Sequence, residues 1–175
     1  ASVDLHETAA HHATRVLRLA AGDALTLFDG TGGEYAATLV RADRRGVSVR
    51  IEGFRPIDRE SPLTVTLAQG VAANDAMDYA IRKATELGVT SIQPLVTVRS
   101  APLPPGERAD KRVAHWRQVA IAACEQCGRN RVPEILPPQR LEEWLGGWTG
   151  SGIVLAPDAD RSLATLAPTP APVAL

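Results

Sequence analysis

The residues best suited to chemistry lie in one short segment. Residues 125–133 bring together a carboxylate, two amides and two guanidinium groups, on Glu125, Gln126, Asn130, Arg129 and Arg131. Arginine can pair with a phosphate or a base carbonyl, and amides match the hydrogen-bonding edge of a base. The segment also coincides with the expected end of a helix, where cations serve simply as capping groups. Both interpretations remain open: a nucleotide pocket at the mouth of an α/β sheet, or a capped helix.

A second polar cluster lies near the start of the chain. His11, His12, Arg15 and Arg18 fall within eight residues of an expected helix. Arg15 and Arg18 are three residues apart, so they share one helix face, and His12 lies near it. The pattern is compatible with a phosphate-contacting patch and equally with a solvated surface.

The two cysteines, Cys124 and Cys127, form a CxxC pair. Redox pairs of this kind work at a helix N-terminus, where the positive end of the dipole lowers the thiol pKa. Here the pair precedes Gly128, near the predicted end of a helix. One pair also lacks the other two ligands of a zinc site. We therefore interpret both cysteines as ordinary small side chains and predict no metal site.

The overall composition is that of an ordinary soluble globular protein. Hydrophobic residues make up 45% of the 175 residues and charged residues 22%. No apolar run approaches the roughly 20 residues that span a bilayer, so we predict a cytoplasmic protein without a membrane partner. The net charge is −1. Any binding to RNA must therefore depend on a local concentration of positive charge.

The first sixty residues predict a helix followed by short strands. Helical spacing of apolar residues covers His6 to Arg18. Strand-like runs then alternate with turn signals rich in glycine and aspartate. The predicted strands cover residues 25–28, 35–41 and 47–51, and the turns cover residues 29–33 and 43–46. Short strands with tight turns favour a small β-barrel.

The segment from Phe54 to Pro62 contains two prolines and several charges and is the expected linker. It divides the chain into predicted domains of residues 1–58 and 59–175. After it, strands and helices alternate, which predicts a mainly parallel α/β sheet. The predicted strands are 63–70, 92–98, 153–155 and 173–175. The predicted helices run from a cap at Asn74 or Asp75 to Leu87, from the end of the Pro102 to Gly106 loop to Cys127, and over 141–145. The long helix is expected to bury Val113, Trp116, Ala120, Ala123 and Cys127.

Five motifs in a fixed order make the sequence resemble a known family. They are His12-Ala13-Thr14-Arg15-Val16-Leu17-Arg18, Phe28-Asp29-Gly30, Met77-Asp78 leading to Lys83-Ala84-Thr85-Glu86-Leu87-Gly88-Val89, Arg99-Ser100, and Glu125-Gln126-Cys127-Gly128-Arg129 to Pro133. Together they resemble the successive signatures of RsmE-type ribosomal RNA methyltransferases, of the SPOUT superfamily. The ordered set covers nearly the whole chain.

The resemblance implies a fold and an activity. The expected fold is a PUA-like RNA-binding barrel followed by a SPOUT α/β domain with a C-terminal trefoil knot. The expected reaction transfers a methyl group from S-adenosyl-L-methionine to N3 of a uridine in small-subunit (16S) ribosomal RNA. The expected assembly is a homodimer acting on that RNA, within the small ribosomal subunit.

The resemblance also implies roles for particular residues. Glu125 and Arg129 are the expected catalytic residues, with Arg129 stabilising charge on the base oxygens and Glu125 taking the proton or holding Arg129. RNA contacts are expected from His12, Arg15, Arg18, Arg99, Gln126 and Arg131. Cofactor contacts are expected from Leu155, Ala156 and Pro157. In the family a Gly-Pro-Glu-Gly-Gly loop completes the knot and most of the cofactor pocket; its place is expected beyond Leu175, which would leave the knot incomplete in this chain.

Two alternatives to a methyltransferase come from other classes. A non-catalytic RNA-binding module would keep the barrel and half of the α/β domain without methyl transfer. A CxxC redox protein is the third, more remote, reading.

Overall fold

The computed structural model describes residues 1–102, 106–156, 158–166 and 172–175. It divides into two compact units, residues 1–59 and 60–175, one residue beyond the boundary that the linker predicts. Within the described residues, no helix is both long and apolar enough to cross a membrane.

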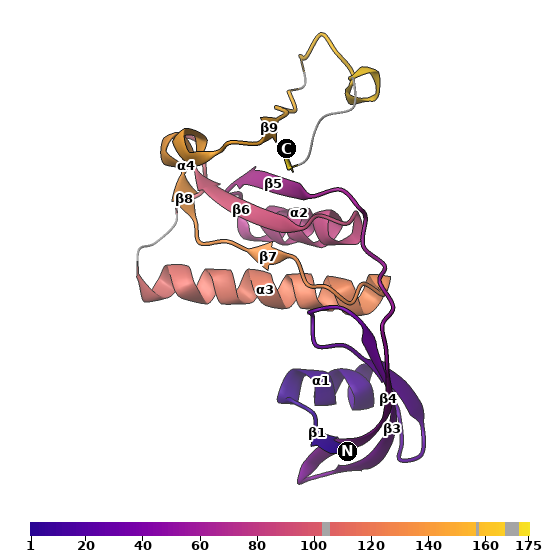
Figure 1. Cartoon of the computed structure of the whole chain (residues 1–175). Helices are drawn as coiled ribbons and strands as arrows, with labels where there is room; N and C mark the ends of the chain where they lie inside the picture. The colour runs from indigo at the N-terminus through magenta and orange to yellow at the C-terminus, as the bar shows by residue number, and fades with distance from the viewer. Residues whose placement is uncertain (103–105, 157, 167–171) are drawn as a thin grey trace. The chain divides into compact units, whose positions relative to one another are not determined.

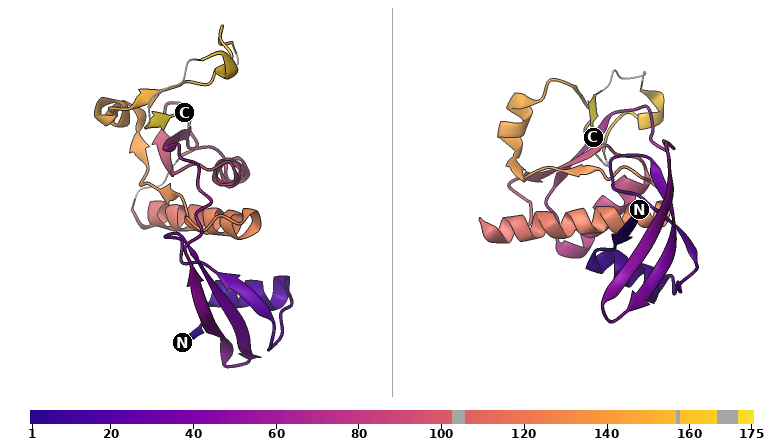
Figure 2. Two further views of the ribbon diagram at one scale, coloured as in Figure 1. Left: turned by 45° about the vertical axis from the view of Figure 1, so that its right-hand side comes forward. Right: turned by 60° about the horizontal axis from the view of Figure 1, so that its bottom comes forward.

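The first unit is an antiparallel sheet with one helical segment (Figures 1 and 2). Its strands are β1 (Ser2–Asp4), β2 (Ala24–Leu27), β3 (Glu34–Asp43) and β4 (Gly46–Arg55). They pair in the order β1-β4-β3-β2, so β1 and β2 are the edge strands. The three predicted strands are confirmed as β2, β3 and β4, although β4 continues four residues further. Edge strand β1 has no counterpart in the sequence prediction.

The opening helix differs from the predicted one. It consists of α1 (Glu7–His11) and a π-helical turn (His12–Val16), and it ends before Arg18. Arg18 has a φ of 56°, in the left-handed region that usually requires glycine. The amide of Leu19 then bonds to the carbonyl oxygen of Ala13 at 2.9 Å, which closes the helix end. This ending could not be predicted from the residue type, because arginine is a good helix former.

The second unit is a parallel sheet with α-helices (Figure 1). Its strand order is β7-β6-β5-β10-β9, with β8 also paired to β6. Every one of these pairings is parallel, as predicted. The elements are β5 (Val65–Gly70), α2 (Asn74–Glu86), β6 (Ser91–Val96), α3 (Glu107–Cys127), β7 (Glu134–Ile135), β8 (Gln139–Arg140), α4 (Leu141–Gly147), β9 (Ser151–Gly152), the 3-10 turn η2 (Leu163–Thr165) and β10 (Val173–Ala174).

Helices α2 and α3 pack together against this sheet, and the three elements form the hydrophobic core of the unit. On the helices the core side chains recur at helical spacing, which buries one face of each helix, whereas β6 is buried continuously from Ile92 to Leu95. The core side chains are Val71, Met77, Ile81, Val89, Ile92, Val113, Trp116, Ala120 and Ile135. The structure confirms Val113, Trp116, Ala120 and Ala123 as the buried face of α3. Cys127 was wrongly included: it is exposed, and Cys124 is buried instead.

Two glycines end the helices where the sequence predicts. Gly128 follows α3 with a φ of 80°, and its amide bonds to the carbonyl oxygen of Cys124. Gly88 follows α2 with a φ of 92°. At the other end of α2, the predicted side-chain cap is wrong, because no side chain caps the helix there. The Asn74 side chain accepts a hydrogen bond from Arg112 instead.

The predicted buried strand at Ile153 to Leu155 is also wrong. The strand is β9, Ser151–Gly152, and the three apolar residues follow it. Val154 is 88% exposed and Leu155 64%. An apolar run cannot by itself distinguish a buried strand from an apolar segment left at the surface.

The partner of β6 changes halfway along its length. Ser91 and Ile92 pair with β7, whereas Leu95 and Val96 pair with β8. Between these pairs lies Pro94, which has no amide hydrogen for a sheet bond. The buried side chain of Gln93 spans the interruption, since its amide nitrogen donates to the carbonyl oxygen of Pro137 at 2.8 Å.

Candidate functional site

The parallel strands give the second unit two distinct edges. Residues that precede a strand lie at the amino edge of the sheet, and residues that follow it lie at the carboxyl edge. In open α/β sheets, ligands bind at the carboxyl edge. The predicted site residues of this unit divide between the two edges.

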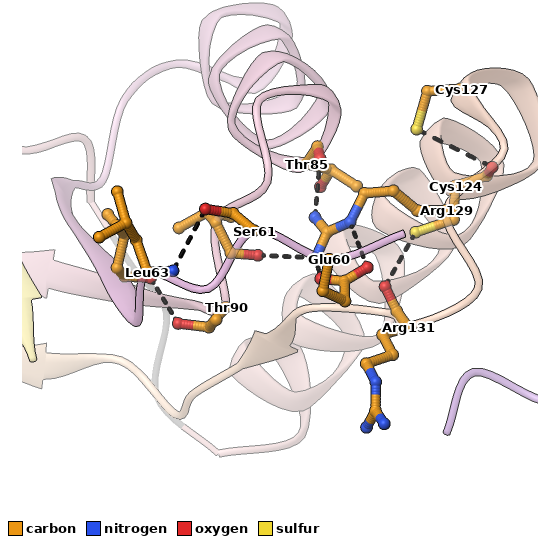
Figure 3. A network of polar contacts seen from close by, with 11 residues as sticks. Glu60, Ser61, Leu63, Thr85, Thr90, Cys124, Cys127, Arg129 and Arg131 are labelled. Atoms are coloured by element: carbon orange, nitrogen blue, oxygen red, sulfur yellow. Dashed lines mark hydrogen bonds and ion pairs between the residues drawn. The ribbon is translucent and has the colours of Figure 1, made fainter. Parts of the chain in front are cut away.

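The segment around Arg129 lies at the amino edge, before β7. The Arg129 guanidinium is buried, with 7% of the residue exposed. Its Nε donates to one carboxylate oxygen of Glu60 at 3.1 Å and its Nη2 donates to the other. Its Nη1 donates to the carbonyl oxygen of Thr85 at 2.7 Å, and Nη2 donates to that of Val89 at 3.1 Å. Figure 3 shows Glu60 and Thr85 beside the Arg129 guanidinium.

The electrostatics of this cluster keep Arg129 charged. Burial acts to lower the pKa of Arg129, but the hydrogen bonds and the charge of Glu60 outweigh it, and the net shift is upward. Nearby, burial raises the pKa of the Cys124 thiol to about 11, against the opposing effect of Arg129. A thiol with so high a pKa stays protonated near neutral pH, so Cys124 is a poor nucleophile.

The neighbouring predicted residues point elsewhere. Glu125, Gln126 and Arg131 are exposed. The Arg131 carbonyl oxygen lies 3.5 Å from the Cys124 sulfur, while the Arg131 side chain extends away from the Arg129 network (Figure 3). These three side chains are accessible to a large partner such as RNA. The carboxylate that pairs with Arg129 is that of Glu60, and not that of Glu125 as the sequence suggested.

Glu60 was missed by sequence reasoning. It lies in the linker-like segment before β5, where a single acidic residue carries no recognisable signal. It meets Arg129 only through the fold, 69 residues away in the sequence. Covariation of positions 60 and 129 among homologues would be the signal to seek.

A cleft of about 730 Å³ opens at the carboxyl edge, after β9. Leu155 and Ala156, two of the predicted cofactor-binding residues, line it; Pro157 lies outside the described residues. The rest of the lining is mostly apolar, with Asp160 and Arg161 as its charged groups. Its lining comes from residues 152–166 alone and is largely open to solvent, so it forms one wall of a small-molecule site rather than a closed pocket. The structure does not bring Glu125 or Arg129 to this cleft.

Arg99 also lies at the carboxyl edge, in the turn that follows β6, and it is exposed. Among the described residues, no group of three or more histidine, cysteine, aspartate or glutamate side chains is arranged to hold a metal ion.

The three predicted RNA contacts of the first unit lie on its opening segment. Arg15 and Arg18 are exposed and His12 is half-buried. His12 and Arg15 belong to the π-helical turn, and Arg18 occupies the left-handed position after it. π-Helical turns and left-handed non-glycine residues are both uncommon and concentrate at functional sites.

Comparison with known protein families gives a separate match for each of the two units. Residues 59–174 match the family described as RNA methyltransferase domain, and residues 5–52 match the RNA methyltransferase PUA domain. The chain belongs to the RNA methyltransferase family. Its first unit is therefore a PUA-like domain, and its second is the methyltransferase domain.

Relatives of this RNA methyltransferase family member carry the name ribosomal RNA small subunit methyltransferase E. The protein from Buchnera aphidicola (subspecies Acyrthosiphon pisum) is 32% identical over 77% of this chain and 53% of its own length. The Bacillus subtilis protein is 29% identical, again over 77% of this chain and 53% of its own length. The chain thus spans about half the length of these curated relatives.

Solved structures extend the similarity to nearly the whole of this chain. The ribosomal RNA small subunit methyltransferase E of Neisseria gonorrhoeae, crystallised with S-adenosyl methionine, superposes with a TM-score of 0.90 at 34% identity. A Legionella pneumophila protein in complex with the same cofactor gives 0.92, also at 34%. Each alignment covers 99% of this chain and 72% of the other. The predicted resemblance to the RsmE family is confirmed.

Proposed function

We propose that this chain supplies the RNA-binding surface and part of the cofactor site of a methyltransferase acting on N3 of a uridine in 16S ribosomal RNA. The observation that carries the proposal is the carboxyl-edge cleft beside Leu155 and Ala156. It occurs in a chain that aligns almost completely with relatives crystallised with S-adenosyl methionine.

The residues of the cleft fit this cofactor. Apolar side chains such as Leu155, Leu163 and Leu166 suit the adenine ring, and Asp160 suits a hydroxyl or ammonium group. When bound, S-adenosyl-L-methionine supplies an electrophilic methyl group. The family resemblance adds the trefoil knot, a homodimer, and further cofactor-binding segments beyond Leu175, all of which stay predictions.

The target atom determines what the protein must do. Uridine N3 carries a proton, so methylation requires a group to take that proton and donors to stabilise charge on the flanking base oxygens. Glu125 is exposed, but it lies at the amino edge of the sheet and the cleft lies at the carboxyl edge, so Glu125 does not take the proton of a uridine held at the cleft of the same chain. For Arg129 we favour a positioning role, because its guanidinium is buried and committed to Glu60, Thr85 and Val89. The catalytic roles of both residues stay untested.

RNA contacts are proposed on both units. His12, Arg15 and Arg18 form the basic patch of the PUA-like domain. In the methyltransferase domain, Arg99 lies at the carboxyl edge of the sheet, and Gln126 and Arg131 lie near the amino edge. Arginine contacts to phosphates give the affinity, and their local concentration compensates for the overall charge of −1.

Two measurements test the proposal. Calorimetric titration of S-adenosyl-L-methionine into this chain, with the full-length Neisseria gonorrhoeae relative as positive control, tests the cleft. Leu155→Asp is the matched variant, and it should weaken binding at least tenfold because it places a charge against an apolar ligand surface.

Mass spectrometry of a 16S RNA fragment incubated with chain and cofactor then reports N3-methyluridine. RNA binding without cofactor binding or methylation would favour the non-catalytic RNA-binding module. Absence of both kinds of binding would refute the proposal.

A further inference from the structure

The turn that follows β6 is held rigidly by its own hydrogen bonds. The amide of Thr97 donates to the Oγ of Ser100 at 3.1 Å, and that hydroxyl donates to the carbonyl oxygen of Thr97 at 3.0 Å. The amide of Ser100 donates to the same carbonyl at 3.2 Å. Since both ends of the turn are bonded to each other, its two middle residues, Val98 and Arg99, have little freedom of backbone conformation.

The turn is also fastened to the rest of the domain. The amide of Ala101 donates to the carbonyl oxygen of Val71 at 2.7 Å. One nitrogen of Arg112, on α3, donates to the carbonyl oxygen of Pro102 at 3.0 Å. Its other terminal nitrogen donates to the Oδ1 of Asn74, at the start of α2, at 2.7 Å. Arg112 therefore links three segments: the end of the turn, α2 and its own helix.

The position of Arg112 is itself fixed. Its guanidinium carbon lies 5.8 Å from the centre of the Trp116 ring, which is buried in the core. Stacking on an aromatic face one helical turn away restricts the rotamers of the arginine side chain. The link is thus anchored to the buried core of the domain.

The tip that results is unusual for a surface turn. Val98 is 99% exposed, so a branched apolar side chain is presented to solvent with no intramolecular contact of consequence. The exposed Arg99 stands beside it. Arg140 pairs with Val96 in the sheet register, which brings a second exposed guanidinium to the same edge. Glu142, 3.8 Å from Arg140, is the acidic group that offsets part of this charge.

We propose that the Val98–Arg99 tip is a preformed contact for one nucleotide of the RNA substrate, and that Arg112 is the positioning residue that holds it. Arg99 bonds to a phosphate, and Val98 packs against the adjacent sugar or base. A tip that is ordered before binding loses little conformational entropy on binding. This inference rests on the proposed function.

The test is a double-mutant cycle on RNA affinity. Fluorescence polarisation measures binding of a labelled 16S RNA fragment to the 175-residue protein at several salt concentrations. Arg99→Ala should weaken binding about tenfold and lower the salt dependence by about one phosphate contact. Arg112→Ala should weaken binding about fivefold in the wild-type background and have almost no effect once Arg99 is absent. Arg117→Ala, an exposed arginine on the same helix, is the control for charge.

Amide hydrogen exchange and thermal unfolding separate positioning from general damage. In Arg112→Ala, exchange of the Ala101 amide should accelerate while the amides of β5 keep their protection. If Arg112→Ala weakens binding equally with and without Arg99, or if the Ala101 amide is unaffected, the positioning role is overturned. Failure of the wild-type protein to bind the RNA fragment would instead refute the RNA-binding part of the proposed function, on which this inference rests.

Discussion

Arg129 and Glu60 form a buried ion pair in which both guanidinium edges are used, one against the carboxylate and the other against the carbonyl oxygens of Thr85 and Val89. The pair joins three parts of the methyltransferase domain at the amino edge of its sheet: the segment before β5, the end of α2, and the segment before β7. A residue that the sequence nominates for catalysis thereby becomes part of the domain's framework.

Breaking this pair should destabilise the methyltransferase domain. Arg129→Ala removes the guanidinium that pairs with the mostly buried Glu60 carboxylate, and we expect the free energy of unfolding to fall by about 3–5 kcal/mol. Urea denaturation followed by tryptophan fluorescence measures it, because Trp116, Trp144 and Trp148 all lie in this domain. The exposed Arg131→Ala is the control, with an expected change within about 0.5 kcal/mol. A near-native midpoint for Arg129→Ala would contradict the framework role.

The two cysteines should differ sharply in reactivity. At pH 8, iodoacetamide should modify the exposed Cys127 and leave Cys124 intact, because burial raises the pKa of Cys124 to about 11. Intact-mass spectrometry should therefore show a single adduct, which Cys127→Ser abolishes. Rapid modification of Cys124 in the folded protein would contradict its burial.

The same shift predicts a pH dependence of stability. The pKa of Cys124 is higher in the folded protein than its ordinary value of 9.0, so the folded state holds this proton more tightly than the unfolded chain. Its contribution to stability is fully present below pH 9 and is lost as the pH rises from 9 through 11. The loss between these pH values should be smaller in Cys124→Ala, measured by urea denaturation at each pH against wild type.

Gln93 should be important for the sheet although it touches no proposed ligand. Gln93→Leu removes the donor to the Pro137 carbonyl oxygen where β6 changes partners, and we expect a loss of about 1–3 kcal/mol. Leucine fills much of the same volume, so the effect reports the loss of the two hydrogen bonds that the Gln93 amide donates, to the carbonyl oxygens of Pro137 and Pro94. Gln118→Leu, at an exposed position of α3, serves as the comparison. Equal stability of the two variants would show that the bridge contributes nothing.

Arg18 should lower the stability of the PUA-like domain and raise its affinity for RNA. Arg18→Gly relieves a left-handed backbone conformation and should stabilise the PUA-like domain by about 1 kcal/mol. The same change removes a basic side chain, so RNA binding should weaken and its salt dependence should fall. Arg18→Ala separates the effects, since it loses the charge but keeps the strain. If Arg18→Gly neither stabilises the domain nor weakens RNA binding, the left-handed conformation of Arg18 is not linked to RNA binding.

The sequence by itself determined the order and type of most elements. Period-two and helical apolar patterns located β3, β4, α2 and α3, and Gly88 and Gly128 marked the helix ends, because these signals depend on local backbone geometry. The ordered motifs identified the family. Local patterns were misleading where the conformation depends on tertiary contacts. The two cases are the left-handed Arg18, and Ile153 to Leu155, whose apolar run remained at the surface.

Only the tertiary structure decided which site residues meet. Strand direction placed Arg129 at the amino edge and Leu155 with Ala156 at the carboxyl edge, although the family resemblance gave all three a role in the same methyl-transfer reaction. The pairing of Arg129 with Glu60, and of Arg112 with Asn74, joins residues 69 and 38 positions apart. Such contacts depend on how the whole chain returns on itself, and one sequence carries no record of that path.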